Sequence, residues 1–275
     1  MLPSYLLSLR EGIEAALIVG IVLGALRQMR RSDMFSAVWL GVLSASLLSV
    51  LSAVLLTALG LSFEGRSEQI FEGLAMLLAA GVLTWMIFWM SRQARHIKGE
   101  LESGVHKAAF ESGKRGLFAL AFLAVLREGI ELALFLVAVV FASDVGQTLI
   151  GAFLGLGTAI LLGWSLFATT VRLDLRRFFQ VTGFLLILFA AGLVAHGVHE
   201  FNEAGVIPAV IEHVWNINPL LDENAALGSA LTALFGYNGD PSLTEVLSYF
   251  AYFTAILVGL RLSDRGAKTA IQPQT

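Results

Sequence analysis

Long runs of apolar residues, separated by short polar stretches, occupy most of the 275-residue chain. A helix needs about 20 apolar residues to cross the hydrocarbon core of a bilayer. Runs of about this length cover residues 3 to 26, 35 to 61, 69 to 90, 117 to 142, 147 to 171, 178 to 199 and 243 to 261. The pattern therefore predicts an all-α integral membrane protein with seven transmembrane helices. Because the first run contains charges and lacks a basic leader, we expect a retained helix there and not a signal peptide.

The basic residues gather on one side of this predicted topology. Fifteen of the eighteen Lys and Arg residues follow the first, third, fifth and seventh runs. Basic loops remain on the cytoplasmic side of a membrane. We therefore expect the N-terminus outside and the C-terminus inside. Charged residues make up only 14% of the chain, against roughly 25% in soluble domains, which agrees with a membrane protein.

Two halves of the chain repeat a pattern. The stretch "LREGIE" occurs at residues 9 to 14 and again at 126 to 131, and "AAGVL" at 79 to 83 resembles "AAGLV" at 190 to 194. In both cases the two copies lie about three helices apart in the chain. Because three is an odd number, the second copy would cross the membrane in the opposite direction to the first. The sequence thus predicts two inverted three-helix repeats, a plan found in secondary transporters.

We expect one transmembrane permease domain over residues 1 to 275. Its predicted parts are repeat one at 1–92, a cytoplasmic basic linker with a helical extension at 91–116, repeat two at 117–200, an outer acidic segment at 200–242, helix seven at 243–261 and a cytoplasmic tail at 262–275.

The repeated stretch places charges where a membrane makes them costly. Its charged members are Arg10, Glu11 and Glu14 in the first copy, and Arg127, Glu128 and Glu131 in the second. Residues three or four apart share a helix face, so the two carboxylates of each copy can reach a common point. An ionised group near the bilayer centre costs about 2.5 to 3.5 kcal/mol. We therefore expect these groups to face each other, water or a bound ion.

Four glutamates against two arginines leave two negative charges unmatched, which favours a cation site. A salt-bridge cluster that only fixes helix packing is the alternative. The chain has no cysteine, so thiolate ligands are excluded and carboxylate oxygens favour a hard cation such as magnesium, calcium, manganese or iron(III). Ligand type alone selects none of these.

Weaker candidates lie near the outer ends of the third and sixth runs. Glu72 and Glu68 are four residues apart; Glu72 is a candidate ligand, and the alternative is a charge that complements the helix dipole. The stretch "HGVHEFNEAG" places His196, His199, Glu200 and Glu203 on one helix face. A solvated outer surface is the simpler interpretation of this group, with capture of ions as the second.

Enzymes of several classes lack support in this sequence. It contains no Gly-x-Ser-x-Gly, no His-Glu-x-x-His and no cysteine nucleophile, so we expect no enzymatic activity. We also expect no nucleic-acid partner. A structural subunit of a larger complex stays open as another class.

The doubled Arg-Glu-Gly-hydrophobic-Glu motif resembles the oxidase-dependent iron transporter family, which includes fungal high-affinity iron permeases and bacterial EfeU-type permeases. The resemblance extends to "FEGLAMLLAAGVLTWMIFWM", "FNEAG" and "FGY". It implies that Glu11, Glu14, Glu128 and Glu131 carry iron and that Arg10 and Arg127 are their partners.

The same resemblance implies an iron permease of the bacterial inner membrane, with iron as substrate and no permanent cofactor. Separate periplasmic iron-binding and haem-peroxidase-like proteins are the implied partners, beside membrane lipid and a possible second copy of the chain. Transport of another metal, such as lead or manganese, is the alternative within this class.

Overall fold

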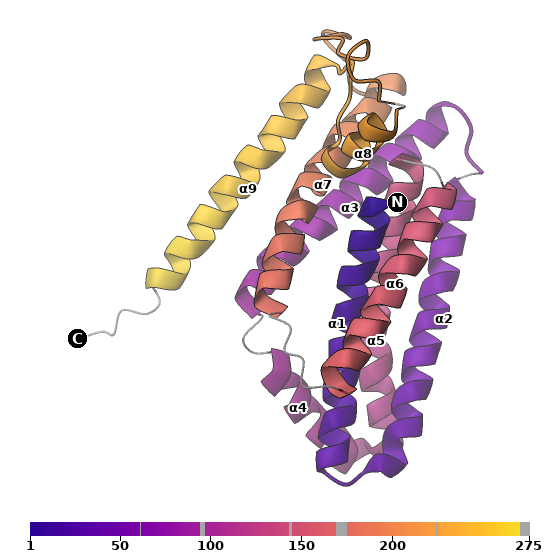
Figure 1. Ribbon diagram of the computed structural model, residues 1–275, viewed down its shortest axis with the longest axis vertical. Helices are drawn as coiled ribbons and strands as arrows, with labels where there is room; N and C mark the ends of the chain where they lie inside the picture. The colour runs from indigo at the N-terminus through magenta and orange to yellow at the C-terminus, as the bar shows by residue number, and fades with distance from the viewer. Residues whose placement is uncertain (61, 94–96, 143–144, 169–174, 224, 270–275) are drawn as a thin grey trace. The chain divides into compact units, whose positions relative to one another are not determined.

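The computed structural model describes the chain except for residues 61, 94–96, 143–144, 169–174, 224 and 270–275 (Figure 1). The α-helices of the described residues are α1 (Leu2–Gln28), α2 (Phe35–Gly60), α3 (Arg66–Gln93), α4 (Ile97–Lys107), α5 (Gly113–Ala142), α6 (Val145–Ala168), α7 (Leu175–Glu203), α8 (Ala226–Phe235) and α9 (Leu243–Thr269). A 3-10 turn, η1, covers Ser32–Met34, and a π-helical turn, η2, covers Ala108–Ser112.

The seven apolar runs coincide with the seven long helices α1, α2, α3, α5, α6, α7 and α9, apart from residues 61 and 169–171, which lie outside the described part. The helical extension expected in the basic linker is present as α4 and η2. Helix α8 was not predicted. It lies in the acidic segment at 200–242 and ends at Gly236, whose left-handed backbone (φ +66°) stops the helix.

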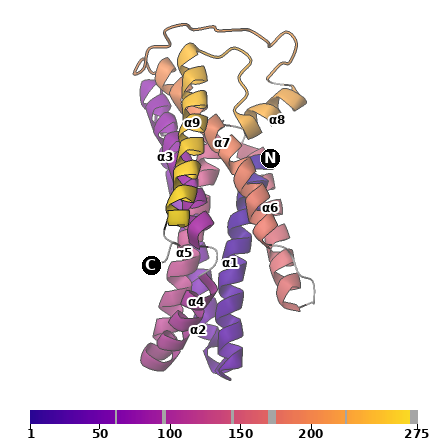
Figure 2. The same ribbon diagram turned by 90° about the vertical axis from the view of Figure 1, so that its left-hand side faces the viewer.

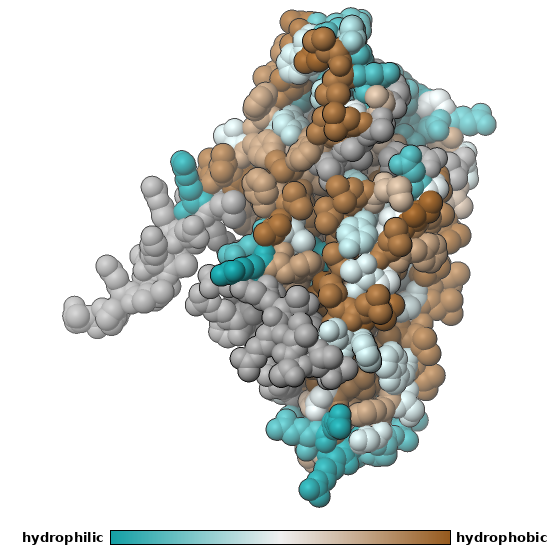
Figure 3. Space-filling model, in the orientation of Figure 1, coloured by the Kyte–Doolittle hydropathy of each residue, from teal (hydrophilic) through white to brown (hydrophobic). Residues whose placement is uncertain are grey.

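Four described segments are long and apolar enough to cross a membrane: Ser32–Gly60, Arg66–Phe88, Val145–Ser165 and Arg177–Glu203. Helices α1 and α5 are of similar length, 27 and 30 residues, but contain the motif charges. The chain is thus a helical membrane protein. Figure 3 shows apolar colour along the α2 flank, where Leu40, Leu43, Leu47, Val50, Leu51, Val54 and Leu55 are exposed.

The helices form two compact units. The first contains residues Met1–Glu64 and Met90–Leu186, and the second contains Gly65–Trp89 and Ile187–Thr275. Helices α1, α2, α4, α5 and α6 thus belong to the first unit, and α3, α8, α9 and most of α7 belong to the second.

In the first unit, α1 packs along α6, α2 packs along α5, and α1 also contacts α5 (Figure 1). Small side chains allow these close approaches, as is common between membrane helices. On α2 the buried face repeats every four residues, at Ala37, Gly41, Ala45 and Ser49. On α6 the matching face is Gly151, Gly155, Ala159 and Gly163, which lie against α1. Helix α4 of the same unit lies against α1 and α5 (Figure 2), where its Val105 packs with Val22, Leu26 and Leu117.

In the second unit, α3 and α7 cross at two glycines. A Cβ atom added to Gly73 would lie 3.0 Å from the carbonyl oxygen of Gly197. Farther along α3, the hydroxyl oxygens of Thr84 and Tyr252 are 2.8 Å apart, which joins α3 to α9. These contacts hold together the helices that carry Glu72 and His199.

Candidate metal centre

The first motif forms a buried ion-pair group on α1. The guanidinium of Arg10 donates from Nη1 to Oε1 of Glu11 at 2.9 Å and lies 3.1 Å from Oε1 of Glu14 through Nη2. Arg10 and Glu11 are only 2% and 1% exposed. A continuous helix creates this grouping because positions 10 and 14 are one turn apart. Arg10 therefore contacts both carboxylates of its motif and neutralises one of their two negative charges.

The second motif repeats the arrangement on α5 with one difference. Nε of Arg127 donates to Oε1 of Glu131 at 3.0 Å and lies 4.0 Å from Oε1 of Glu128. The Arg127 side chain is 38% exposed, whereas Glu128 and Glu131 are buried. The two arginines thus occupy different surroundings although their sequence contexts match.

Carboxylates from the two motifs meet. Glu11, Glu128 and Glu131 each offer an oxygen, and these three oxygens lie within 4.8 Å of one another. Among the described residues, no other set of three His, Asp or Glu side chains meets this distance. Glu14 is outside the triplet and is paired with Arg10. The structure therefore brings together three of the four motif glutamates.

Two of these carboxylates retain free acceptor atoms. Within the described part of the chain, Oε2 of Glu11 and Oε2 of Glu131 are buried and accept no hydrogen bond. A buried oxygen without a donor costs free energy. A cation among the three carboxylates would remove this cost, since it takes the lone pairs that no donor satisfies.

The motif glycines set the spacing around the triplet. A Cβ atom at Gly12 would lie 2.6 Å from Cβ of Ala159 on α6, and one at Gly129 would overlap Oγ of Ser49 on α2. Each motif therefore requires glycine where its helix touches a helix of the other predicted repeat. This explains why the third motif position has no side chain.

The outer candidates belong to the second unit. Glu72 and Glu68 are half-buried on α3. On α7, Nε2 of His199 lies 3.2 Å from Oε1 of Glu203, and Glu203 also accepts a hydrogen bond from Gln69 of α3 at 2.9 Å. Glu200 is half-buried on the same helix, and the neighbouring His196 lies 3.1 Å from the carbonyl oxygen of Gly192 through Nδ1. The structure thus connects the two groups of outer candidates through Gln69.

Glu245 is a buried carboxylate that the sequence reasoning missed. Its Oε1 atom lies 3.0 Å from Nδ1 of His199 and accepts the backbone N–H of Ser242, while Oε2 accepts from Asn238. The backbone N–H of Glu245 donates in return to Oγ of Ser242. This reciprocal pair is a capping box at the start of α9, and the letters "SLTE" were its signal. The apolar run alone did not reveal it.

Comparison with known proteins identifies the family of the chain. The family model described as "Iron permease FTR1 family" matches residues 1–270. The chain belongs to this iron permease family. It is 36% identical to the protein named "Ferrous iron permease EfeU" of Shigella sonnei, over 98% of this chain and 99% of that one.

A second relative agrees with the first. The "Ferrous iron permease EfeU" of Yersinia pestis is 35% identical over 96% of this chain and 95% of that protein. No solved structure matches the chain. The expected family resemblance is therefore confirmed over nearly the full length, and iron transport by a permease is supported as the activity.

Proposed function

We propose that the chain imports ferrous iron and that Glu11, Glu128 and Glu131 bind the ion during its passage. The observation that carries this proposal is the meeting of three buried carboxylates from two helices, two of them with unsatisfied oxygens. The names of the relatives favour iron(II) over lead, manganese and iron(III) as cargo. Carboxylate oxygens accept several divalent metals, so the ligands alone do not make this choice.

The charge balance of the site suits a divalent cation. Four glutamates and two arginines sum to two negative charges when all are ionised, which one ferrous ion neutralises. Arg10 holds Glu14 beside the triplet, and Arg127 holds Glu131 within it. Each arginine would release or reorient a carboxylate when iron enters. Water would supply the remaining ligands of the ion.

Reciprocal packing supports the inverted repeat. The motif of α5 lies 117 residues after the motif of α1 in the sequence. Gly151 of α6 lies 110 residues after Gly41 of α2, which makes these two glycines the corresponding positions of the second helix pair. Gly41 lies against the carbonyl oxygen of Phe118, and Gly151 lies against the carbonyl oxygen of Met1. Met1 and Phe118 are themselves 117 residues apart. The contact of Gly129 with Ser49 corresponds in the same way to that of Gly12 with Ala159. These two contacts of one half therefore each have a counterpart in the other.

A transport cycle follows from this arrangement. Repeats related by inversion can exchange conformations and so open a midplane site to either side. Seven spanning helices, with the N-terminus outside and the basic segments in the cytoplasm, would place the two motifs at similar depth from opposite faces. We expect the helix pair α1 and α6 to shift against the helix pair α2 and α5.

The outer candidates would act before the central site. Glu68, Glu72, Glu200 and Glu203 supply negative charge, and His199 orients Glu203, because its two ring nitrogens lie 3.2 Å from Glu203 and 3.0 Å from Glu245. Negative potential raises the local concentration of cations. We propose that this group gathers iron outside the bacterial inner membrane. Separate periplasmic iron-binding and peroxidase-like proteins would deliver the ion, and a second copy of the chain is a further possible partner.

Uptake by purified protein in liposomes tests the proposal. Glu128→Gln removes a charge from the triplet with little change in volume, and Glu111→Gln removes an exposed carboxylate in η2 as the matched control. We expect the first variant to lose iron(II) uptake and the second to retain it. Equal uptake by both would overturn the proposed site. Uptake by the chain alone would also exclude a purely structural subunit, and competition by manganese or lead would measure selectivity.

A further inference from the structure

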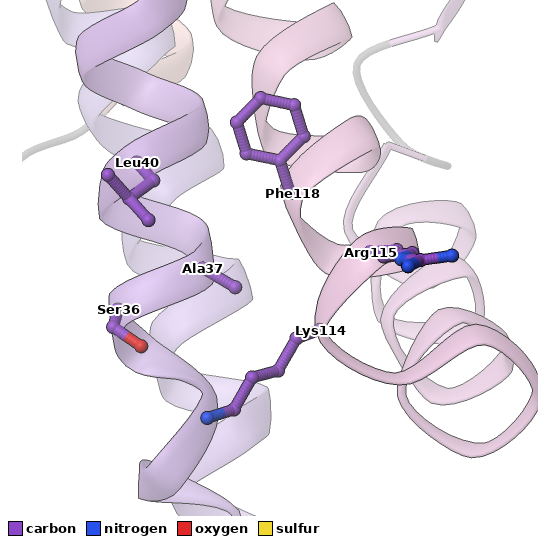
Figure 4. Close-up of a pocket in the computed structure, with 6 residues that line it drawn as sticks. All are labelled: Ser36, Ala37, Leu40, Lys114, Arg115 and Phe118. Atoms are coloured by element: carbon purple, nitrogen blue, oxygen red, sulfur yellow. The ribbon is translucent and has the colours of Figure 1, made fainter.

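A groove between the first turns of α2 and α5 lies apart from the glutamates. It has a volume of about 260 Å³ and is lined by Ser36, Ala37, Leu40, Lys114, Arg115 and Phe118. Figure 4 shows the Lys114 side chain extending toward α2 near Ser36, whereas Arg115 points away from the gap. The groove thus combines one cationic group with an otherwise mainly apolar lining.

The cationic group of this groove has no ion-pair partner among the residues that the structure describes. Lys114 forms no ion pair with any residue in the described part of the chain, and the same is true of Arg115. The hydroxyl group of Ser36 lies on the opposite wall, in the first turn of α2. The helix dipole adds positive potential at the start of a helix. An anion with oxygen acceptors would therefore complement this end of the groove.

The rest of the groove and its surroundings are apolar. Leu40 is 58% exposed, and Leu43 and Leu47, at 63% each, continue the same exposed face along α2. The ring of Phe118 on the other wall stacks on Phe122, with ring centroids 5.7 Å apart. A ligand seated at Lys114 would thus meet a continuous hydrocarbon surface. An inorganic anion would leave this surface unused.

We propose that this groove binds an anionic phospholipid, with the phosphate at Lys114 and Ser36 and an acyl chain along Leu40 and Leu43. The proposal rests on the topology proposed above, which puts the starts of α2 and α5 at the cytoplasmic leaflet, where anionic lipids attract basic residues. The lipid would bridge the pair α2 and α5. Since α5 carries Glu128 and Glu131, bound lipid would stabilise one wall of the metal centre.

Native mass spectrometry of the full chain in detergent, without iron, tests the lipid site. The probe is phosphatidylglycerol, and phosphatidylcholine provides the zwitterionic comparison. Lys114→Gln should weaken phosphatidylglycerol binding about fivefold, the effect of one basic residue at an anionic surface. Lys107→Gln, at an exposed position at the end of α4, is the matched control and should bind as the unchanged protein does.

Leu40→Gln separates a lipid from a simple anion. It leaves Lys114 in place and should weaken binding of phosphatidylglycerol but not of inorganic phosphate. Equal binding of the two lipids, unchanged binding in Lys114→Gln, or binding of inorganic phosphate that competes fully with the lipid would each overturn the proposal. Because no iron is present, failure of the proposed transport function would leave this result unaffected.

Discussion

Arg10 and Arg127 offer a matched test because they occupy the same motif position in different surroundings. Arg10 is 2% exposed and contacts two carboxylates, whereas Arg127 is 38% exposed. Replacement of either by Met keeps a long side chain but removes the charge. We predict that Arg10→Met destabilises the protein far more than Arg127→Met.

The magnitude follows from burial. Removing one partner of a buried ion pair costs about 3 to 5 kcal/mol, because the remaining charge has neither water nor a counter-ion. Arg127 is reached by solvent although its partner Glu131 is buried, so we expect its removal to cost less than that of Arg10, which is buried together with Glu11. At about 2 to 4 °C per kcal/mol, Arg10→Met should lower Tm by about 6 to 20 °C, and Arg127→Met should lower it by less.

Thermal unfolding of both variants in one detergent, followed by intrinsic tryptophan fluorescence, measures the difference. Ferrous iron should raise Tm in both variants, since a ligand at about 100 times its Kd stabilises the folded state by about 2.7 kcal/mol. Equal shifts in Tm for the two variants would refute the assignment of Arg10 as the buried counter-ion. A loss of Tm in Arg127→Met alone would refute it as well.

Three further results are expected. Gly12→Leu should abolish folded protein, because a Cβ atom at position 12 would meet Ala159. Gly24→Leu should be tolerated, because nothing lies within 4 Å of a Cβ atom added there. Size-exclusion chromatography separates these outcomes, and equal elution profiles of the two variants would contradict the packing described for Gly12. Glu14→Gln should weaken iron(II) binding less than Glu11→Gln does, since Glu14 lies outside the triplet. Titration of each variant with iron(II) measures the two affinities. A larger loss of affinity in Glu14→Gln would contradict this expectation. Glu245→Gln preserves the capping box but removes the charge beside His199. We therefore expect a severalfold higher KM for iron uptake with kcat unchanged. An unchanged KM would exclude Glu245 from ion capture.

The long helices were predictable because apolar length alone specifies them in a membrane. Helix α8 was not, since its ten residues are too few to cross a bilayer and lie within an acidic segment. Its end at Gly236 depends on contact with Gly192 of α7, which no local pattern reveals.

The candidate site was predictable as two motifs but not as a triplet. Helical spacing places Glu11 and Glu14 on one face, yet the side-chain pairing of Arg10 decides which of them joins the second motif. Glu245 was missed because its neighbours read as the beginning of an apolar run, although "SLTE" carries a capping signal. Side-chain geometry, more than helix position, separates the three glutamates that meet from Glu14.

Crystals of the protein soaked anaerobically with ferrous iron would locate the ion directly by anomalous scattering at the iron absorption edge. We predict one peak among the carboxylates of Glu11, Glu128 and Glu131, and its loss in Glu128→Gln crystals prepared in the same way. An iron peak only at Glu72, Glu203 or His199, or a central peak unchanged in Glu128→Gln, would contradict the proposed metal centre.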